Sequence, residues 1–212
     1  MRHAEVRYFE GVDPEHVVLT EDGRAQAEAA AAALRDVAFD RVVTSGLTRT
    51  IETARIVAPG HKAEARYDLR EIESGDIREL PPDEVQRMMT AAFRGVVPLD
   101  TRFLGGETIG EFLDRVLPEI DTLLAEDDWD TALLVLHGAV NRAILSHALI
   151  GERTFLGGFE QAPGAINVLD VGADGRWIVR GVNLTPYDPV QVGALRLTTM
   201  EQLWQEYLNS RA

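Results

Sequence analysis

The stretch from Ala132 to Leu136 is an unbroken apolar run that ends directly at His137-Gly138. A continuous apolar run of this length suits a strand that is covered on both faces, as in a parallel sheet, because a strand with one wet face would alternate. The run therefore requires helices on both sides of the sheet. It also places His137 at the carboxyl end of a strand, which is where ligands bind in open α/β sheets.

The remaining pattern alternates between strands and helices, with Thr20 as a helix N-cap and Thr108 with Glu111 as a capping box. Pro118 lies inside an expected helix and predicts a kink or a break. We expect helices over 21–34, 47–57, 83–93, 108–125, 140–150 and 199–207, strands over 39–44 and 132–136, an edge strand over 63–69, and a hairpin of 165–171 with 176–182. This order predicts a three-layer α/β/α sandwich with a mainly parallel sheet.

The length of 212 residues suits a single domain over 1–212. Residues 75–107 include Pro81-Pro82 and several glycines, and we expect them to form a substrate-facing insertion whose last part, 94–107, is an irregular loop. The sequence shows no repeat and no low-complexity linker. The Leu- and Trp-containing C-terminal segment leaves a homodimer open.

The formal net charge is -14, which argues against binding of nucleic acid or of anionic membranes because the average field repels both. A small anionic substrate is compatible with this charge, since screening lets a local group of arginines decide what a pocket attracts. No apolar run is long enough to span a membrane and no signal-peptide pattern occurs, so we expect a soluble cytoplasmic protein.

The lack of cysteine and the scarcity of lysine exclude several kinds of catalytic site. The chain has no cysteine, which excludes disulfides, thiol nucleophiles and cysteine metal sites. Lys62 is the only lysine, so the sequence cannot supply the phosphate-binding lysine of a P-loop. A zinc site built on His3, His137 and an acid is disfavoured, because there is no His-x-x-x-His pair and the neighbouring arginines would repel a cation.

Two histidines, two arginines and one acid could together transfer a phosphoryl group: His3, His137, Arg2, Arg49 and Glu71. A phosphomonoester hydrolyses extremely slowly unaided, so a catalyst must place a nucleophile in line and compensate the phosphoryl charge. Flanking arginines lower the pKa of a histidine and so keep its imidazole neutral and nucleophilic. A glutamic acid could protonate the leaving alkoxide and then activate water.

These residues resemble the histidine phosphatase superfamily, in the branch similar to cofactor-dependent phosphoglycerate mutase. The resemblance runs from Arg2 to about Asp170. Its elements are Arg2-His3-Ala4-Glu5, with alanine in place of glycine; Leu19-Thr20 with Gly23 and Gln26-Ala27; Ser45-Gly46-Leu47-Thr48-Arg49 with Thr53-Ala54; Leu69-Arg70-Glu71 with Gly75; Gly106-Glu107-Thr108; and His137-Gly138 with Asn141-Arg142. Any one of these elements is common, whereas all of them in order are specific.

The resemblance implies a role for each candidate and no metal or organic cofactor. The implied roles are phosphohistidine formation at His3, binding of phosphoryl oxygens by Arg2, Arg49 and His137, and proton donation by Glu71. Glu73 is the alternative acid. Glu71 is favoured over Glu73 because Glu71 directly follows Leu69-Arg70. The implied activity is metal-independent hydrolysis of a small phosphomonoester. A phosphoglycerate-type mutase and a weakly active or inactive binder of phosphorylated ligands remain alternatives.

The chain departs from the family pattern at two places. Family members often carry an asparagine a few residues after the first motif, and here Arg7-Tyr8-Phe9 stands there, so we expect Arg7 to complete the phosphate pocket. The nucleophile of the family follows a central strand, whereas only Met1 precedes Arg2. We therefore expect the sheet position beside 132–136 to be vacant or filled from elsewhere.

Overall fold

The computed structural model describes residues 1–9, 11, 13–91, 93–191 and 197–211, and its central feature is a parallel sheet with the strand order β2-β1-β3. The strands are β1 (Arg41–Thr44), β2 (Glu64–Ala65) and β3 (Ala132–Val135). β1 and β3 pair in parallel, so that Thr44 lies opposite Val135. Both strands therefore end at the same edge, and the residues that follow them, Ser45 and His137, lie close together.

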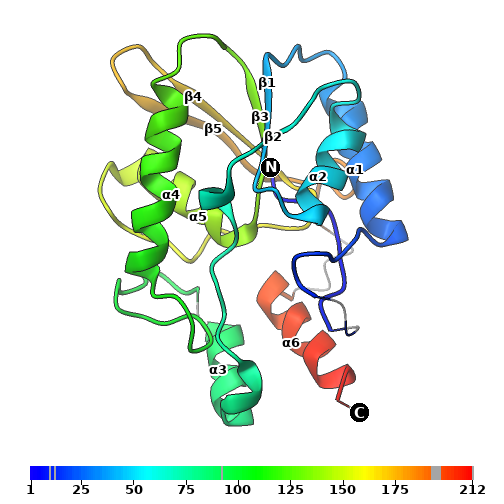
Figure 1. The fold of residues 1–212 in the computed structure, drawn as a ribbon, viewed down its shortest axis with the longest axis vertical. Coiled ribbons are helices and arrows are strands. Elements are labelled where there is room, and N and C mark those ends of the chain that lie inside the picture. Colours follow the sequence, from blue (N-terminus) through cyan, green and yellow to red (C-terminus); the bar gives the residue numbers. More distant parts are fainter. Residues whose placement is uncertain (10, 12, 92, 192–196, 212) are drawn as a thin grey trace.

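Helices cover both faces of this sheet, which confirms the predicted three-layer arrangement (Figure 1). One face carries α1 (Glu21–Leu34) and α2 (Thr48–Val57), and the other carries α4 (Ile109–Leu124) and α5 (Gly138–Ile150). Neighbouring residues of β1 point to opposite layers: Val42 packs in the apolar cluster of α1 and α2, and Val43 in that of α4 and α5. Within the described chain, no helix is both long and apolar enough to cross a bilayer.

The helices begin where the sequence signals predict. Thr20 Oγ1 accepts a hydrogen bond from Gly23 N at 2.9 Å at the start of α1. Thr108 and Glu111 form a complete capping box at the start of α4. These side chains satisfy backbone donors that the first helical turn leaves unpaired.

Of the kink or break predicted at Pro118, the break is wrong, because α4 continues through the proline to Leu124. A proline inside a helix removes one hydrogen bond and costs about 3 kcal/mol or more. α4 offsets this cost through its buried face, since each buried Phe, Leu or Ile side chain contributes about 1.5–3 kcal/mol. The buried apolar residues of that face are Ile109, Phe112, Leu113, Val116, Ile120 and Leu123.

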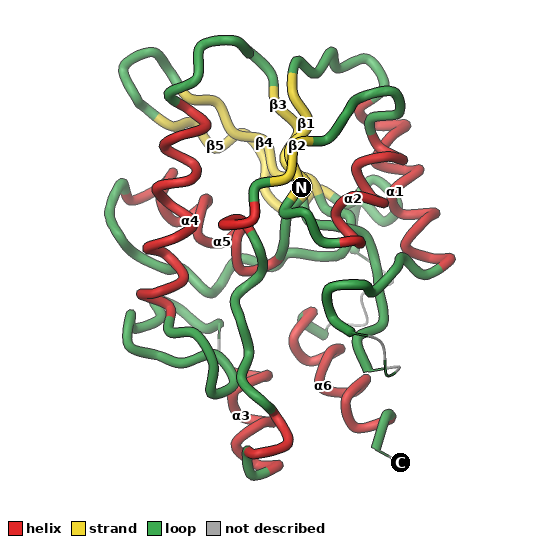
Figure 2. The backbone as a smooth tube through the Cα atoms, in the orientation of Figure 1, coloured by secondary structure: helices red, strands yellow, loops and turns green. Residues whose placement is uncertain are grey.

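The segment between Gly75 and Glu107 lies beyond the sheet, beside the C-terminal helix α6 (Thr199–Asn209) (Figure 1). It contains a short 3-10 turn, η2 (Ile77–Glu79), and the helix α3 (Pro82–Ala91), and it follows another such turn, η1 (Tyr67–Leu69). Figure 2 shows loop on both sides of α3, as predicted for the part after it. Val85 and Met89 of α3 pack with Tyr207 of α6 in a small apolar cluster of their own.

The predicted hairpin is present as an antiparallel pair, β4 (Ile166–Val171) and β5 (Trp177–Leu184). β5 packs against α5. The hairpin forms a sheet separate from the parallel one, since β4 pairs with β5 and not with β3.

Met1 to His3 lie along the carboxyl end of β3. The Met1 nitrogen donates to Leu134 O at 2.6 Å, Leu136 N donates to Met1 O at 2.9 Å, and His3 N donates to Leu136 O at 2.9 Å. Only Arg2 forms a bridge, so no ordinary strand within the described residues leads into His3, as expected. A cavity of about 770 Å³ adjoins Met1 between β3 and β4.

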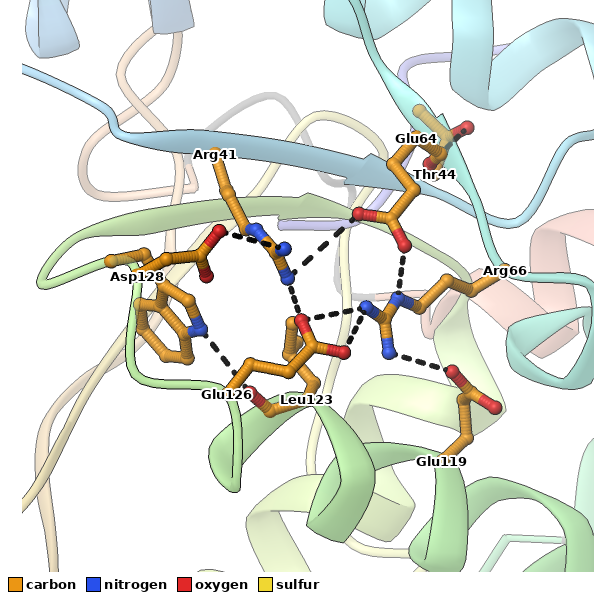
Figure 3. A network of polar contacts seen from close by, with 9 residues as sticks. Arg41, Thr44, Glu64, Arg66, Glu119, Leu123, Glu126 and Asp128 are labelled. Carbon is orange, nitrogen blue, oxygen red and sulfur yellow. Dashed lines mark hydrogen bonds and ion pairs between the residues drawn. The ribbon is translucent and has the colours of Figure 1, made fainter.

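Two arginines fix the edge of the sheet to the C-terminal end of α4 (Figure 3). Glu126 forms ion pairs with both Arg41 and Arg66, the second at 2.8 Å. Arg66 also pairs with Glu64 at 2.8 Å and with Glu119 at 2.9 Å. The Arg66 side chain is only 8% exposed, whereas Glu64 beside it is 44% exposed, so the network is shielded from solvent at Arg66 alone. Its ion pairs link β1, β2 and α4.

Candidate active site

His3 is buried, and its backbone is held from both sides. His3 N donates to Leu136 O, and Gly164 N donates to His3 O. Its Nδ1 lies 2.8 Å from Ala4 O, which can only accept, so we assign the proton to Nδ1 and the lone pair to Nε2. Nε2 is therefore the ring nitrogen able to act as a nucleophile.

His137 lies next to His3, as the sheet topology predicts. The two ring centroids are 5.3 Å apart and the ring planes meet at 65°. Ser45 Oγ, from the end of β1, lies 2.7 Å from His137 Nε2, and Arg49 Nη2 lies 3.4 Å from its Nδ1. Ser45 thus orients the imidazole from the neighbouring strand. Ser45 begins the motif Ser45-Gly46-Leu47-Thr48-Arg49, but no role for it was predicted from the sequence.

Burial and positive neighbours hold both histidines neutral. The pKa of His3 lies well below its ordinary value, first because of burial and then because of Arg49 and Arg2. The pKa of His137 is lowered for the same reasons, with His3 and Arg115 adding to the effect. A neutral His3 keeps its lone pair, which is the state that can attack phosphorus.

Arg2 and Arg49 have donors without a partner in the site. Arg2 Nη1 donates to Gln161 O at 2.6 Å, and Arg49 Nη1 donates to Pro14 O at 2.7 Å. The Nε of each is buried and has no hydrogen bond in the described structure. A buried donor without a partner costs about 1–3 kcal/mol, and an anion bound between the arginines would satisfy both.

Glu71 lies against the N-terminus of α5, directly after His137. Its Oε1 accepts hydrogen bonds from Ala139 N at 3.0 Å and from Ile72 N at 3.1 Å. Glu73 has a side chain that is 65% exposed and lies 3.8 Å from Arg70. Of the two acids, Glu71 is the one that contacts the helix following His137.

Tyr8 reaches His3, although no role was predicted for it from the sequence. Its hydroxyl lies 3.2 Å from His3 Nε2, and the Arg49 guanidinium lies 5.5 Å from the centroid of its ring. Arg7 is exposed, and its part in the pocket stays a prediction. The family pattern drew attention to Arg7-Tyr8-Phe9, but Arg7 and not Tyr8 was expected in the pocket.

Metal-binding side chains are not gathered near these groups. In the described ranges, no three His, Asp or Glu side chains come together in a way that could hold a metal ion. The cationic surroundings of His3 and His137 suit an anion instead.

Residues 1–185 match the model of the histidine phosphatase superfamily, branch 1. The chain belongs to this superfamily. A probable 2-carboxy-D-arabinitol-1-phosphatase of Arabidopsis thaliana is 29% identical over 84% of the chain, and a probable phosphoglycerate mutase GpmB of Salmonella paratyphi A is 30% identical over 62%. The chain spans only 38% and 63% of the length of these two superfamily members.

Solved structures of the superfamily share the fold. The α-ribazole phosphatase of Shigella flexneri is 25% identical with a TM-score of 0.66, over 86% of this chain and 94% of that one. A mycobacterial glucosyl-3-phosphoglycerate phosphatase, at 22% identity, has a TM-score of 0.67 over 87% of this chain and 95% of that one. Phosphatases are therefore among the relatives of this chain.

Proposed function

We propose that this protein is a phosphatase that hydrolyses a small phosphomonoester through a phosphohistidine at His3, without a metal. The observation that carries the proposal is the state of His3. Its Nδ1 is engaged by Ala4 O, which leaves Nε2 as the nucleophile, and Arg2 and Arg49 beside it have donors without partners. A nucleophile next to cationic donors that can bind a phosphoryl group is what phosphoryl transfer requires.

In the first step, the lone pair of His3 Nε2 forms a bond to phosphorus while the ester P–O bond breaks. Arg2, Arg49 and His137 bind the phosphoryl oxygens, whose charge they compensate. The leaving alkoxide takes a proton from the protonated carboxyl group of Glu71, and the alcohol departs. General acid catalysis of this kind contributes a factor of roughly 100 to 10,000.

In the second step, the Glu71 carboxylate removes a proton from water, whose oxygen attacks phosphorus. The P–N bond breaks, His3 recovers its lone pair, and inorganic phosphate leaves. Glu71 thus ends the cycle protonated, as it began. The same residue serves as acid and then as base, which requires the alcohol and the water to approach phosphorus from the same side.

A phosphoglycerate-type mutase is the second candidate, and the similarity to the probable mutase of Salmonella favours it. A mutase would return the phosphoryl group of His3 to a substrate hydroxyl instead of to water. Incubation with 3-phosphoglycerate separates the two, since a phosphatase releases inorganic phosphate and a mutase forms 2-phosphoglycerate.

The test is hydrolysis of p-nitrophenyl phosphate in the presence of EDTA by the wild-type protein and two variants. His3→Ala removes the proposed nucleophile, and His16→Ala is the matched control, because that side chain is exposed and pairs only weakly with Asp13 at 3.9 Å. We expect turnover in the wild type and in His16→Ala and none in His3→Ala. No turnover in any of the three would leave the protein a binder of phosphorylated ligands, and loss of turnover with EDTA would reject the metal-free route.

A further inference from the structure

The loop 161–165, which leads into β4, holds both Arg2 and His3. Arg2 Nη1 donates to Gln161 O at 2.6 Å, and Arg2 N donates to a second carbonyl oxygen of the loop at 2.9 Å. Gly164 N donates to His3 O at 3.0 Å. The position of this loop therefore sets both the direction of the Arg2 guanidinium and the place of His3.

The side chain of Gln161 is fixed in turn by Asn167 of β4. The two amide groups donate to each other, Gln161 Nε2 to Asn167 Oδ1 at 3.1 Å and Asn167 Nδ2 to Gln161 Oε1 at 2.8 Å. Gln161 is fully buried, and its Nε2 also donates to Glu160 O at 2.8 Å. Both polar atoms of this buried amide have partners, and a fully paired buried network favours a single arrangement.

Asn183 of β5 completes the network from the opposite strand. Its N donates to Asn167 Oδ1 at 2.9 Å, and its own Oδ1 accepts a hydrogen bond from Ala162 N in the loop at 2.7 Å. The register of the hairpin shifts between Ile166 and Val168, where two residues of β5 lie opposite one residue of β4. Asn183 is one of these two residues, so it lies in a β-bulge opposite Asn167.

The backbone of Asn183 is left-handed, with a φ of 54°. This conformation is rare outside glycine, and asparagine is one of the few other residues that adopt it. Bulges and strained residues of this kind gather beside functional sites, where they direct a side chain. Here the bulge brings the amide oxygen of Asn183 to the loop that holds Arg2 and His3.

We propose that Asn167 and Asn183 are positioning residues of the phosphoryl-transfer site, which act by holding the loop 161–165 against Arg2. The proposal rests on the proposed function for the role of Arg2 as a phosphoryl ligand. Arg2 Nη1 is engaged by Gln161 O, whereas Arg2 Nε has no partner in the described structure. The network thus fixes which donors of the guanidinium face an anion, and a guanidinium binds an anion well only in a defined orientation.

The test measures the binding of inorganic phosphate to the His3→Ala protein by calorimetry. Asn183→Gly removes the amide and adopts the left-handed backbone without strain. We expect it to weaken phosphate binding about tenfold, since a hydrogen bond to a charged group contributes about that factor. Asn183→Asp keeps an oxygen that can accept from Ala162 N, and it should restore most of the binding. Val179→Ala is the control, because it weakens the same strand opposite Leu169 and lies outside the amide network.

Urea unfolding of each variant separates positioning from stability. Val179→Ala should lower the free energy of unfolding and leave phosphate binding unchanged. An equal loss of binding in Val179→Ala and Asn183→Gly overturns the proposal, as does a loss that Asn183→Asp does not restore. Unchanged binding in Asn183→Gly, or no binding by the His3→Ala protein, also overturns it.

Two further provisions keep the test decisive. If Asn183→Gly does not fold, Asn167→Ser takes its place, because it breaks the amide pair with Gln161, and binding that this variant leaves unchanged overturns the proposal. Turnover plays no part in the comparison. A wild type that binds phosphate through this network but hydrolyses no phosphomonoester would therefore reject the proposed function alone.

Discussion

The hydroxyl of Tyr8 lies 3.2 Å from His3 Nε2, the ring nitrogen that we propose as the nucleophile. A phosphoryl group in position for attack would need the same place, because reacting atoms approach to about 3–3.5 Å. The hydroxyl therefore competes with the substrate for the nucleophile in the free protein. The backbone nitrogen of Tyr8 donates a hydrogen bond to Glu206 of α6 at 2.8 Å. This bond couples the tyrosine to the C-terminal helix.

Tyr8→Phe should lower the KM for p-nitrophenyl phosphate by about two- to fivefold, since the substrate no longer has to displace a hydrogen bond worth about 0.5–1.5 kcal/mol. The inhibition constant of inorganic phosphate should fall by a similar factor. Steady-state kinetics at neutral pH checks both values. An increase in KM would instead make the hydroxyl a substrate ligand.

Arg49→Met should lower kcat/KM by roughly 100-fold, because removing one partner of a buried charge pair costs about 2–5 kcal/mol. It should also move the acid limb of the pH profile to higher pH. The charge of Arg49 lowers the pKa of both His3 and His137, so its removal raises them and protonates the nucleophile sooner as the pH falls. A pH profile with an unmoved acid limb would show that Arg49 acts on substrate binding alone.

The two buried histidines should make stability depend on pH. In the folded protein their pKa values lie well below 6.5, so the unfolded state binds more protons as the pH falls through that value. The free energy of unfolding should therefore decrease below pH 6.5, by at most about 1.4 kcal/mol per pH unit for each histidine. Urea unfolding of the wild type and of His3→Gln/His137→Gln checks this, and equal pH slopes in the two proteins would contradict it.

Gly23→Ala should destabilise the protein although alanine favours helices. A Cβ at Gly23 would lie 2.3 Å from Glu5 O, a backbone atom in the loop after the nucleophile. Overpacking of this kind costs typically about 1–3 kcal/mol, against a gain in helix propensity of about 1 kcal/mol at most. Gly158→Ala is the control, because a Cβ there meets nothing within 4 Å. Chemical unfolding should show a lower free energy of unfolding for Gly23→Ala and an unchanged one for Gly158→Ala. A higher free energy of unfolding for Gly23→Ala would show that the loop moves aside without cost.

Much of the fold follows from local patterns. The apolar run 132–136, the Thr20 cap and the capping box of Thr108 predict elements that the structure contains. The expected edge strand over 63–69 shortens to Glu64–Ala65, and Arg66 turns toward Glu119 and Glu126 of the α4 layer. Ion pairs between segments this distant in the chain leave no local signal, so sequence reasoning overestimated the strand.

The candidate site, like the fold, could be predicted from the sequence only in part. His3 and His137 were expected at one sheet edge because strand ends meet there, and their rings do lie together. The contacts of Ser45 and Tyr8 with the two histidines were not foreseen. Each of them arises where a loop or helix reaches the edge through tertiary packing, so the spacing of residues along the chain does not encode it.

The most direct test of the account is to trap the phosphorylated protein. The wild type is mixed with p-nitrophenyl phosphate, quenched in alkali within the first turnovers, and mapped by mass spectrometry of its peptides. We predict one acid-labile, alkali-stable phosphoryl group on His3, with none on the His3→Ala protein. Turnover of the substrate with a phosphoryl group on another residue, or with none on His3 at any time, would contradict the central claim.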